Sequence, residues 1–142
     1  MQKSIVLIVE DDFMIADCLE EILTAAGFSV CGIASTTAEA IALGERYNPD
    51  LGVIDLRLSE GEFGTDVAAA LHARGGFGVL YASGNPDHPL LRSATGEGLI
   101  GKPYTAVAVV AALGIVREQM SGLPLSAFPQ GFRLLHSGAD PV

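Results

Sequence analysis

Polar side chains of different chemical kinds follow four apolar runs in this chain. The runs, each with the polar residues at its end, are residues 5–9 with Glu10 and Asp11, 51–54 with Asp55, 77–82 with Ser83 and Gly84, and 99–101 with Lys102. If the runs are strands of one parallel sheet, their carboxyl ends meet at the edge where open α/β sheets bind ligands. Carboxylates, a hydroxyl and an ammonium group gathered there would suit a divalent cation and a phosphoryl group.

The three carboxylates indicate a Mg²⁺ site. Glu10, Asp11 and Asp55 would repel one another at close range unless a cation neutralised them or one of them took up a proton. Mg²⁺ prefers oxygen ligands and pairs readily with phosphate. We expect Asp55 to be the nucleophile, because a carboxylate at the tip of a central strand can attack phosphorus and form an aspartyl phosphate.

The remaining side chains would then serve the phosphoryl oxygens. Lys102 would neutralise them as a point charge, Ser83 would donate a hydrogen bond, and Gly84 would let the backbone approach closely. Each residue taken alone has a simpler explanation. Acids at positions 10–12 suit the start of a helix, and Lys-Pro is common in solvated turns. The four strand ends taken together favour a site.

Apolar periodicity predicts the elements that position these residues. Strand-like runs span residues 3–9, 28–34, 51–56, 77–83 and 99–102, and helical patterns span residues 15–26, 36–45, 65–74 and 105–120. Thr36 and Thr65 are predicted to cap the second and third helices. Residues 84–98 contain Pro86 and Pro89, so any helix there should be short. The alternation predicts an α/β fold, a doubly wound sheet of five parallel strands with helices on both faces.

This arrangement resembles the receiver domain of two-component response regulators. The resemblance is carried by Val-Glu-Asp-Asp at 9–12, Asp-Leu-Arg-Leu at 55–58, Ser-Gly at 83–84 and Lys-Pro at 102–103, and it covers about residues 4–120. It implies the flavodoxin-like strand order 2-1-3-4-5. It also implies a signalling receiver rather than an enzyme, with chemistry limited to its own phosphorylation and dephosphorylation.

The resemblance implies how the acidic residues are used. Asp55 would accept a phosphoryl group from a histidine kinase or phosphotransfer protein. Mg²⁺ would be held by Glu10, Asp11, Asp55 and the backbone carbonyl of Arg57. The loop after Asp55 departs from the family pattern: the proline common four residues after the acceptor is replaced by Ser59, and the loop that follows looks one residue longer than usual.

The resemblance also implies a switch. Lys102 would contact the phosphoryl group, with a cis peptide bond to Pro103, and Ser83 would swing toward that group on activation. The aromatic residue that usually completes the switch is replaced by Leu99. Tyr81 is the candidate for its role, because the segment Val-Leu-Tyr-Ala-Ser-Gly resembles receivers of the Phe-Ala-Thr-Gly type. The ordinary alternative is a half-buried tyrosine with a satisfied hydroxyl.

Charge and composition argue against several other functions. The net charge of −9 and the eight basic residues disfavour binding to DNA or RNA. No uncharged stretch of about 18 apolar residues indicates a membrane span, and the first residues do not resemble a signal peptide. Two cysteines, Cys18 and Cys31, fit a reduced, cytoplasmic chain better than a disulfide-stabilised one.

The last helix and the tail bear on where a partner binds. We expect residues 1–120 to form the receiver and residues 121–142 an apolar tail, with no output domain. The last helix carries a stripe of small residues that includes Val107, expected against the sheet, and a second stripe that includes Val109 and needs a cover. Folding of the tail back over its own domain is the favoured cover, ahead of an intermolecular contact such as a homodimer, or disorder. A downstream protein partner would bind the face formed by the fourth helix, fifth strand and fifth helix.

Two alternative functions remain open. A receiver-like interaction module that never uses phosphate would share the fold, although the intact set of Asp55, Ser83 and Lys102 argues against it. A flavodoxin-like small-molecule binder or a haloacid-type phosphohydrolase fits less well. No Gly-rich loop follows the first strand, and the second Asp that such hydrolases need two residues after the nucleophile is Arg57 here.

Overall fold

Strands and helices alternate along residues 3–136, the part of the chain that the computed structural model describes. The strands are β1 (Ile5–Val9), β2 (Ser29–Ala34), β3 (Leu51–Asp55), β4 (Gly78–Ser83), β5 (Gly98–Gly101) and β6 (Phe132–Leu134). The α-helices are α1 (Phe13–Ala25), α2 (Thr37–Tyr47), α3 (Gly64–His72) and α4 (Ala106–Met120). Short 3₁₀ turns, η1 (Ser59–Gly61) and η2 (Pro89–Arg92), follow β3 and β4.

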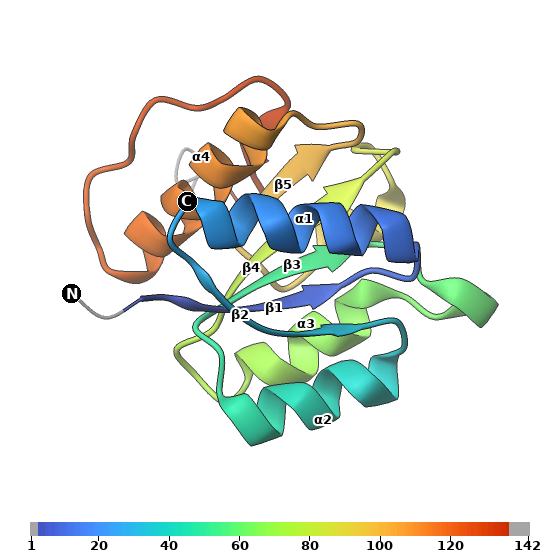
Figure 1. The fold of residues 1–142 in the computed structure, drawn as a ribbon. Coiled ribbons are helices and arrows are strands. Elements are labelled where there is room, and N and C mark those ends of the chain that lie inside the picture. The colour runs from blue at the N-terminus through green and yellow to red at the C-terminus, as the bar shows by residue number, and fades with distance from the viewer. Residues whose placement is uncertain (1–2, 137–142) are drawn as a thin grey trace.

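The described residues form a sheet of six strands in the order β2-β1-β3-β4-β5-β6, of which Figure 1 labels β1 to β5. Strands β1 to β5 are parallel and follow the predicted order 2-1-3-4-5, which confirms the fold class. The prediction of five strands was incomplete, because β6 from the tail pairs antiparallel with β5. The carboxyl ends of the five parallel strands therefore lie along one edge of the sheet.

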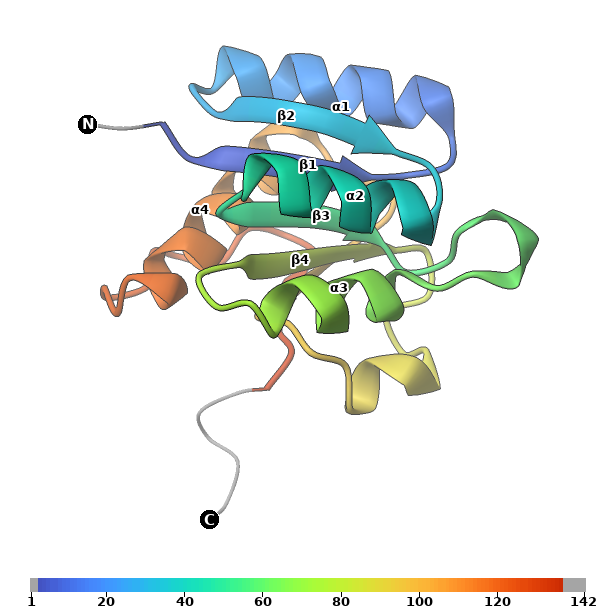
Figure 2. The same cartoon turned by 90° about the horizontal axis from the view of Figure 1, so that it is seen from below.

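Helices cover both faces of the sheet, as predicted. The helices α1 and α4 lie on one face, and α2 and α3 lie on the other (Figure 1, Figure 2). The first face has a core that includes Leu23 of α1 and Leu113 of α4. The second has a core that includes Leu56 and Leu71. Because both faces are covered, the central strands are apolar at nearly every position.

Side-chain caps fix where α1 and α2 begin, and Thr105 likewise caps α4 by accepting from the N–H of Ala108. Asp12 accepts hydrogen bonds from the N–H groups of Met14 and Ile15 and so starts α1. Thr36 accepts from the N–H of Glu39 at the start of α2, as predicted. These caps satisfy donors that the first helical turn leaves without an intrahelical partner.

The start of α3 differs from the prediction. Thr65 does not cap this helix, which begins one residue earlier, at Gly64, after Phe63, whose side chain makes no capping bond. A Cβ atom on Gly64 would lie 2.1 Å from the carbonyl oxygen of Asp55. Only glycine lets α3 begin this close to the end of β3, and that steric requirement overrides the capping preference of Thr65.

The connection between β4 and β5 contains no α-helix in the described chain. Its helical piece is η2, a 3₁₀ turn of four residues that begins with Pro89. This agrees with the short helix predicted for residues 84–98. Leu91 is buried and anchors the turn to the core under α3. As a result, α4 occupies the place of the predicted fifth helix.

The helix α4 packs on the sheet with the opposite stripe from the one predicted. The side chains that it buries are Ala108, Val109, Ala112, Leu113, Ile115 and Val116. Val107, expected against the sheet, is 80% exposed. The stripe with the larger side chains faces the core because it buries more apolar area. Among residues 3–136, no helix, α4 included, is long and apolar enough to cross a membrane.

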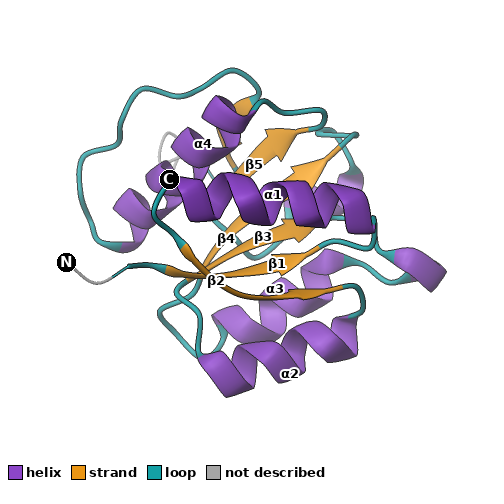
Figure 3. Cartoon of the chain, in the orientation of Figure 1, coloured by secondary structure: helices purple, strands orange, loops and turns teal. Residues whose placement is uncertain are grey.

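Part of the tail folds back on its own domain, the alternative that the sequence favoured. After α4 the chain runs as a long loop before it reaches β6 (Figure 3). Ser126 donates to a carboxylate oxygen of Glu118 at 2.6 Å and holds the loop to α4. Phe132 is buried over Gly98, where a Cβ would lie 2.6 Å from its ring. Residues 137–142 of the tail lie outside the described part of the chain.

Candidate functional site

Four strand ends bring the predicted polar residues to the carboxyl edge of the sheet. Glu10 follows β1, and its N–H donates to the carbonyl oxygen of Ala34 at 2.9 Å. Asp55 is the last residue of β3 and Ser83 the last of β4. Lys102 follows β5, and its N–H donates to the carbonyl oxygen of Ser83 at 2.8 Å. The backbone pairing of the strands thus fixes where each of these side chains starts.

The three predicted carboxylates form a cluster. Glu10, Asp11 and Asp55 each present an oxygen atom within 4.8 Å of the other two. Glu10 is buried, Asp55 is half-buried, and Asp11 lies at the surface. Three hard oxygen donors with one side open to water match what Mg²⁺ requires, since this ion keeps several water ligands. The residues present therefore fit the metal that the resemblance implies.

The ammonium group of Lys102 reaches two of the three acids. Its Nζ lies 2.7 Å from Oε1 of Glu10 and 3.3 Å from Oδ2 of Asp55. The peptide bond between Lys102 and Pro103 is cis. The lysine thus supplies one positive charge against three carboxylates, and the cluster keeps a net negative charge that attracts a cation.

Burial and the contacts with Lys102 together set the protonation of Glu10 and Lys102. Burial raises the pKa of Glu10 to about 7, although the bond from Lys102 counteracts part of the effect. Burial by itself would lower the pKa of Lys102, but its bond to Glu10 and the charge of Asp55 outweigh that effect and raise it. Near neutral pH, a proton on Glu10 therefore competes with a metal ion for the same oxygen atoms.

The comparison with known proteins decides the family. The response regulator receiver domain matches residues 6–114. The chain belongs to the response regulator receiver family. This receiver is 32% identical over 114 residues to the phyllosphere-induced regulator PhyR of Methylorubrum extorquens, an alignment that covers 76% of this chain and 41% of that protein. The chain thus spans less than half the length of this curated relative.

Solved receiver structures share the fold. The solution structure of the receiver domain of PhyR from Erythrobacter litoralis superposes with a TM-score of 0.72 at 24% identity, over 91% of this chain and 98% of that one. The crystal structure of a variant of the anti-anti-sigma factor PhyR from Bartonella quintana gives a TM-score of 0.66 at 25% identity, over 77% of this chain and 46% of that one. Both are consistent with the strand order described above.

In this receiver, the hydroxyl group of Ser83 is bound within its own loop. Its Oγ donates to the carbonyl oxygen of Asn85 at 3.1 Å and accepts from the N–H of Asn85 at 3.0 Å. A Cβ on Gly84 would meet nothing within 4 Å, so this conformation does not require glycine there. To reach a phosphoryl group on Asp55, Ser83 would have to leave Asn85.

The structure places Tyr81 in the core rather than at the site. The side chain is fully buried, and its hydroxyl donates to the carbonyl oxygen of Thr95 at 2.6 Å. Burial raises the pKa of this hydroxyl. Leu99, at the usual aromatic position, lies in the same core. This agrees with the alternative of a tyrosine whose hydroxyl is satisfied, except that the ring is wholly buried and not half-buried. The switch role of Tyr81 stays a prediction.

Contacts around the acids include one that the sequence did not indicate. The Oγ of Ser59 donates to Oδ2 of Asp11 at 2.7 Å, and this bond lowers the pKa of Asp11. The two residues are 48 positions apart, and no motif links them. Asp12 alone caps α1, which leaves its two acidic neighbours to the cluster. Arg57 lies in the loop after β3 and forms an isolated bridge with Phe63.

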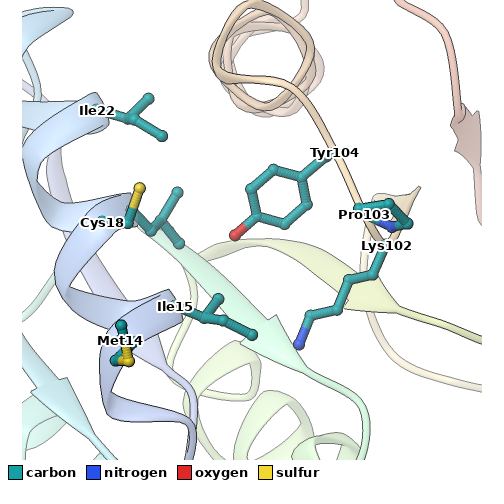
Figure 4. A pocket seen from close by; sticks show the side chains of 8 residues that line it. Met14, Ile15, Cys18, Ile22, Lys102, Pro103 and Tyr104 are labelled. Carbon is teal, nitrogen blue, oxygen red and sulfur yellow. The ribbon is translucent and has the colours of Figure 1, made fainter.

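An apolar groove opens beside the cluster. It has a volume of about 470 Å³ and is lined by Met14, Ile15, Cys18, Leu19, Ile22, Lys102, Pro103 and Tyr104. Figure 4 shows the ring of Tyr104 directed toward α1, with the side chain of Lys102 at one end of the groove. Met14 is 81% exposed at its rim. Because Lys102 also contacts Asp55, a molecule in this groove would lie next to the acidic cluster.

Proposed function

We propose that this receiver accepts a phosphoryl group on Asp55 in a Mg²⁺-dependent reaction and signals to a protein partner through the resulting conformational change. The observation that carries the proposal is the convergence of Glu10, Asp11 and Asp55 within 4.8 Å, with the ammonium of Lys102 at 3.3 Å from Asp55. The protein would act as a signalling component and not as an enzyme. Two free thiols, Cys18 and Cys31, are consistent with a cytoplasmic location.

In the proposed reaction, an oxygen atom of Asp55 attacks the phosphorus of a phosphohistidine. The new O–P bond forms as the N–P bond to the donor imidazole breaks, and the imidazole leaves with the electron pair. Lys102 neutralises a phosphoryl oxygen and gives up its bond to Asp55 as it does so. When bound by Glu10, Asp11, Asp55 and the carbonyl oxygen of Arg57, Mg²⁺ supplies further positive charge for the phosphoryl oxygens.

The donor, a histidine kinase or phosphotransfer protein, is proposed to bind the apolar groove between α1 and Tyr104. Phe13 and Met14, which are 76% and 81% exposed, extend this apolar surface at the start of α1. Exposed apolar side chains next to a groove are typical of protein-binding surfaces. A donor seated there would reach Asp55 past Lys102, which belongs to both the groove and the site.

The downstream partner is proposed to bind the opposite flank of the site. The predicted face of fourth helix, fifth strand and fifth helix is present in altered form, since η2 replaces the helix and β6 covers the edge of β5. Arg133 of β6 bonds the carbonyl oxygen of Pro86, in the loop after Ser83. The solved PhyR structure from Bartonella quintana is named an anti-anti-sigma factor; by analogy, we propose a protein as the output target here.

The proposal is tested by intact-mass spectrometry after incubation with acetyl phosphate, with and without Mg²⁺. The wild type should gain one phosphoryl mass only when Mg²⁺ is present, and hydroxylamine should remove it because the product is an acyl phosphate. Asp55→Ala should gain none. Asp17→Ala, which removes an exposed carboxylate of α1, is the matched control and should behave as the wild type.

Phosphate incorporation by Asp55→Ala would contradict the assignment of the acceptor. If acetyl phosphate labels no variant, the same series is repeated with a phosphorylated histidine phosphotransfer protein as donor. Failure of the wild type with both donors would favour the phosphate-independent interaction module.

A further inference from the structure

The hydrogen bond between Ser59 and Asp11 joins two loops of the site. Asp11 lies between β1 and α1, and Ser59 is the first residue of η1 in the connection from β3 to α3. The Oγ of Ser59 donates to Oδ2 of Asp11 at 2.7 Å. A bond to a carboxylate at this distance is charge-assisted and is stronger than one between neutral groups. Both side chains are exposed, so burial does not force them together.

The loop that carries Ser59 is itself held in place. The N–H of Leu58 donates to the carbonyl oxygen of Glu62 at 2.9 Å, and the Leu58 side chain is buried. A carboxylate oxygen of Glu62 accepts from the N–H of Thr37 at 2.8 Å, which fastens the loop to the start of α2. Glu60, with φ of 62°, turns the chain between them. These bonds hold the backbone of the loop around Ser59, so its side chain starts from a fixed position.

We propose that Ser59 is a positioning residue of the metal site, which holds one oxygen atom of Asp11 so that the other faces Glu10 and Asp55. This inference rests on the proposed function, because it concerns the Mg²⁺ site. A carboxylate has two oxygen atoms, and a partner on one of them restricts how the group rotates. Without that partner, the exposed side chain of Asp11 would sample other rotamers. Restricting it to one rotamer on metal binding would then cost entropy.

The same bond fixes the distance between the two loops that would supply metal ligands. Asp11 comes from the β1–α1 loop, whereas the carbonyl oxygen of Arg57 comes from the loop that Ser59 begins to turn. Arg57 also forms an isolated antiparallel β-bridge with Phe63. Ser59 therefore connects both loops across the metal position, so its loss should loosen the loop even when no metal is present.

The test compares Mg²⁺ affinity by isothermal titration calorimetry in the wild type, Ser59→Ala and Ser59→Thr. Ser59→Ala should raise the Kd for Mg²⁺ by about tenfold, the usual scale for losing a partner of a metal ligand. Ser59→Thr keeps a hydroxyl and should stay close to the wild type. Ser126→Ala is the matched control, because it removes a similar hydroxyl-to-carboxylate bond, to Glu118, far from the site.

A second readout needs no metal. In the metal-free protein, amide hydrogen exchange of residues 57–62 should be faster in Ser59→Ala than in the wild type, and unchanged in Ser126→Ala. Wild-type Mg²⁺ binding with an unchanged Kd in Ser59→Ala would overturn the inference and leave the proposed function intact. Tighter binding by Ser59→Ala would also overturn it, since Ser59 would then compete with the metal for Asp11. If the wild type binds no Mg²⁺, the proposed metal site and this inference fail together.

Discussion

The ammonium group of Lys102 lies 2.7 Å from Oε1 of Glu10, a contact between the ends of two strands that are not neighbours. In the sheet, β3 and β4 separate β1 from β5. The ion pair therefore spans the carboxyl edge of the sheet above the end of β3, where Asp55 lies. A proton, a metal ion or a phosphoryl group bound at this edge would therefore act on the same pair.

The raised pKa of Glu10 predicts that Mg²⁺ binds less tightly in mild acid. Burial raises this pKa to about 7, and the carboxyl must lose its proton before it can hold a cation. The apparent affinity should therefore fall as the pH drops below about 7, and Mg²⁺ binding at neutral pH should release a fraction of a proton. Calorimetry in two buffers of different ionisation enthalpy measures both quantities. Glu10→Gln should bind more weakly without this pH dependence, and a flat profile in the wild type would contradict the prediction.

The same group predicts the pH dependence of stability without metal. The pKa of Glu10 is about 7 in the folded protein against 4.5 for the ordinary side chain, so the folded state holds the proton more tightly. Its contribution to the free energy of unfolding is fully present below about pH 4.5 and is lost as the pH rises through about 7. Urea unfolding of the wild type and Glu10→Gln should diverge over this range, with the wild type losing more. A constant difference between them would show that Glu10 does not titrate there.

Removing the Lys102 ammonium should destabilise the metal-free protein. Lys102→Met leaves Glu10 and Asp55 without their cation, and we expect the free energy of unfolding to fall by about 1–3 kcal/mol. The pKa of Glu10 should rise further, because the bond from Lys102 lowers it in the wild type. Lys3→Met, at an exposed position, is the control and should change stability little. Chemical denaturation and carboxyl NMR titration provide the two measurements.

Gly64→Ala should disrupt the junction between β3 and α3. The added methyl group would lie 2.1 Å from the carbonyl oxygen of Asp55, so the backbone must move, and we expect a loss of about 3 kcal/mol or more. Gly114→Ala in α4 is the control, because its methyl group would meet nothing within 4 Å. It should stabilise the helix by about 0.5–1 kcal/mol. Thermal unfolding of both variants distinguishes a steric effect from a general effect of glycine replacement.

Phe132→Ala should release β6 from the sheet. Phe132 is 8% exposed and lies over Gly98, so truncation should lower the free energy of unfolding by about 2–4 kcal/mol. Amide exchange should accelerate at Gly101 and Leu135, whose N–H groups bond across this strand pair. Leu123→Ala, in the exposed part of the tail, should change neither quantity much. Unchanged exchange at Gly101 in Phe132→Ala would mean that the ring does not hold the strand.

Much of the site was predictable because it depends on strand ends. An apolar run that stops at a polar residue locates Glu10, Asp55, Ser83 and Lys102 without knowledge of any long-range contact, since parallel pairing brings all carboxyl ends to one edge. The bond from Ser59 to Asp11 was not predictable in this way. It depends on the shape of a loop that has no periodicity, and nothing in the sequence around Ser59, four residues after Asp55, indicates Asp11 as its partner.

The fold was predictable where periodicity is long and local. Features that are short or determined by steric fit were not predicted. The strand β6 has three residues, too few for an alternating pattern, and its pairing with β5 is not local. The start of α3 depends on the room that Gly64 leaves for Asp55, which a cap preference cannot report. For α4, apolar on two sides, the burial of Val109 instead of Val107 was decided by side-chain volume against the sheet.

The pairing of β6 with β5 has a consequence for shortened forms of the chain. Residues 6–114, the part shared with the family, omit β6 and the last turns of α4. In such a fragment the backbone of β5 would lose its partner, and Gly98 would lie open where the ring of Phe132 had covered it. An uncovered edge strand next to an apolar depression is a template for pairing with other chains. The fragment should therefore self-associate more readily than the chain that keeps β6, because β6 covers this edge of the sheet.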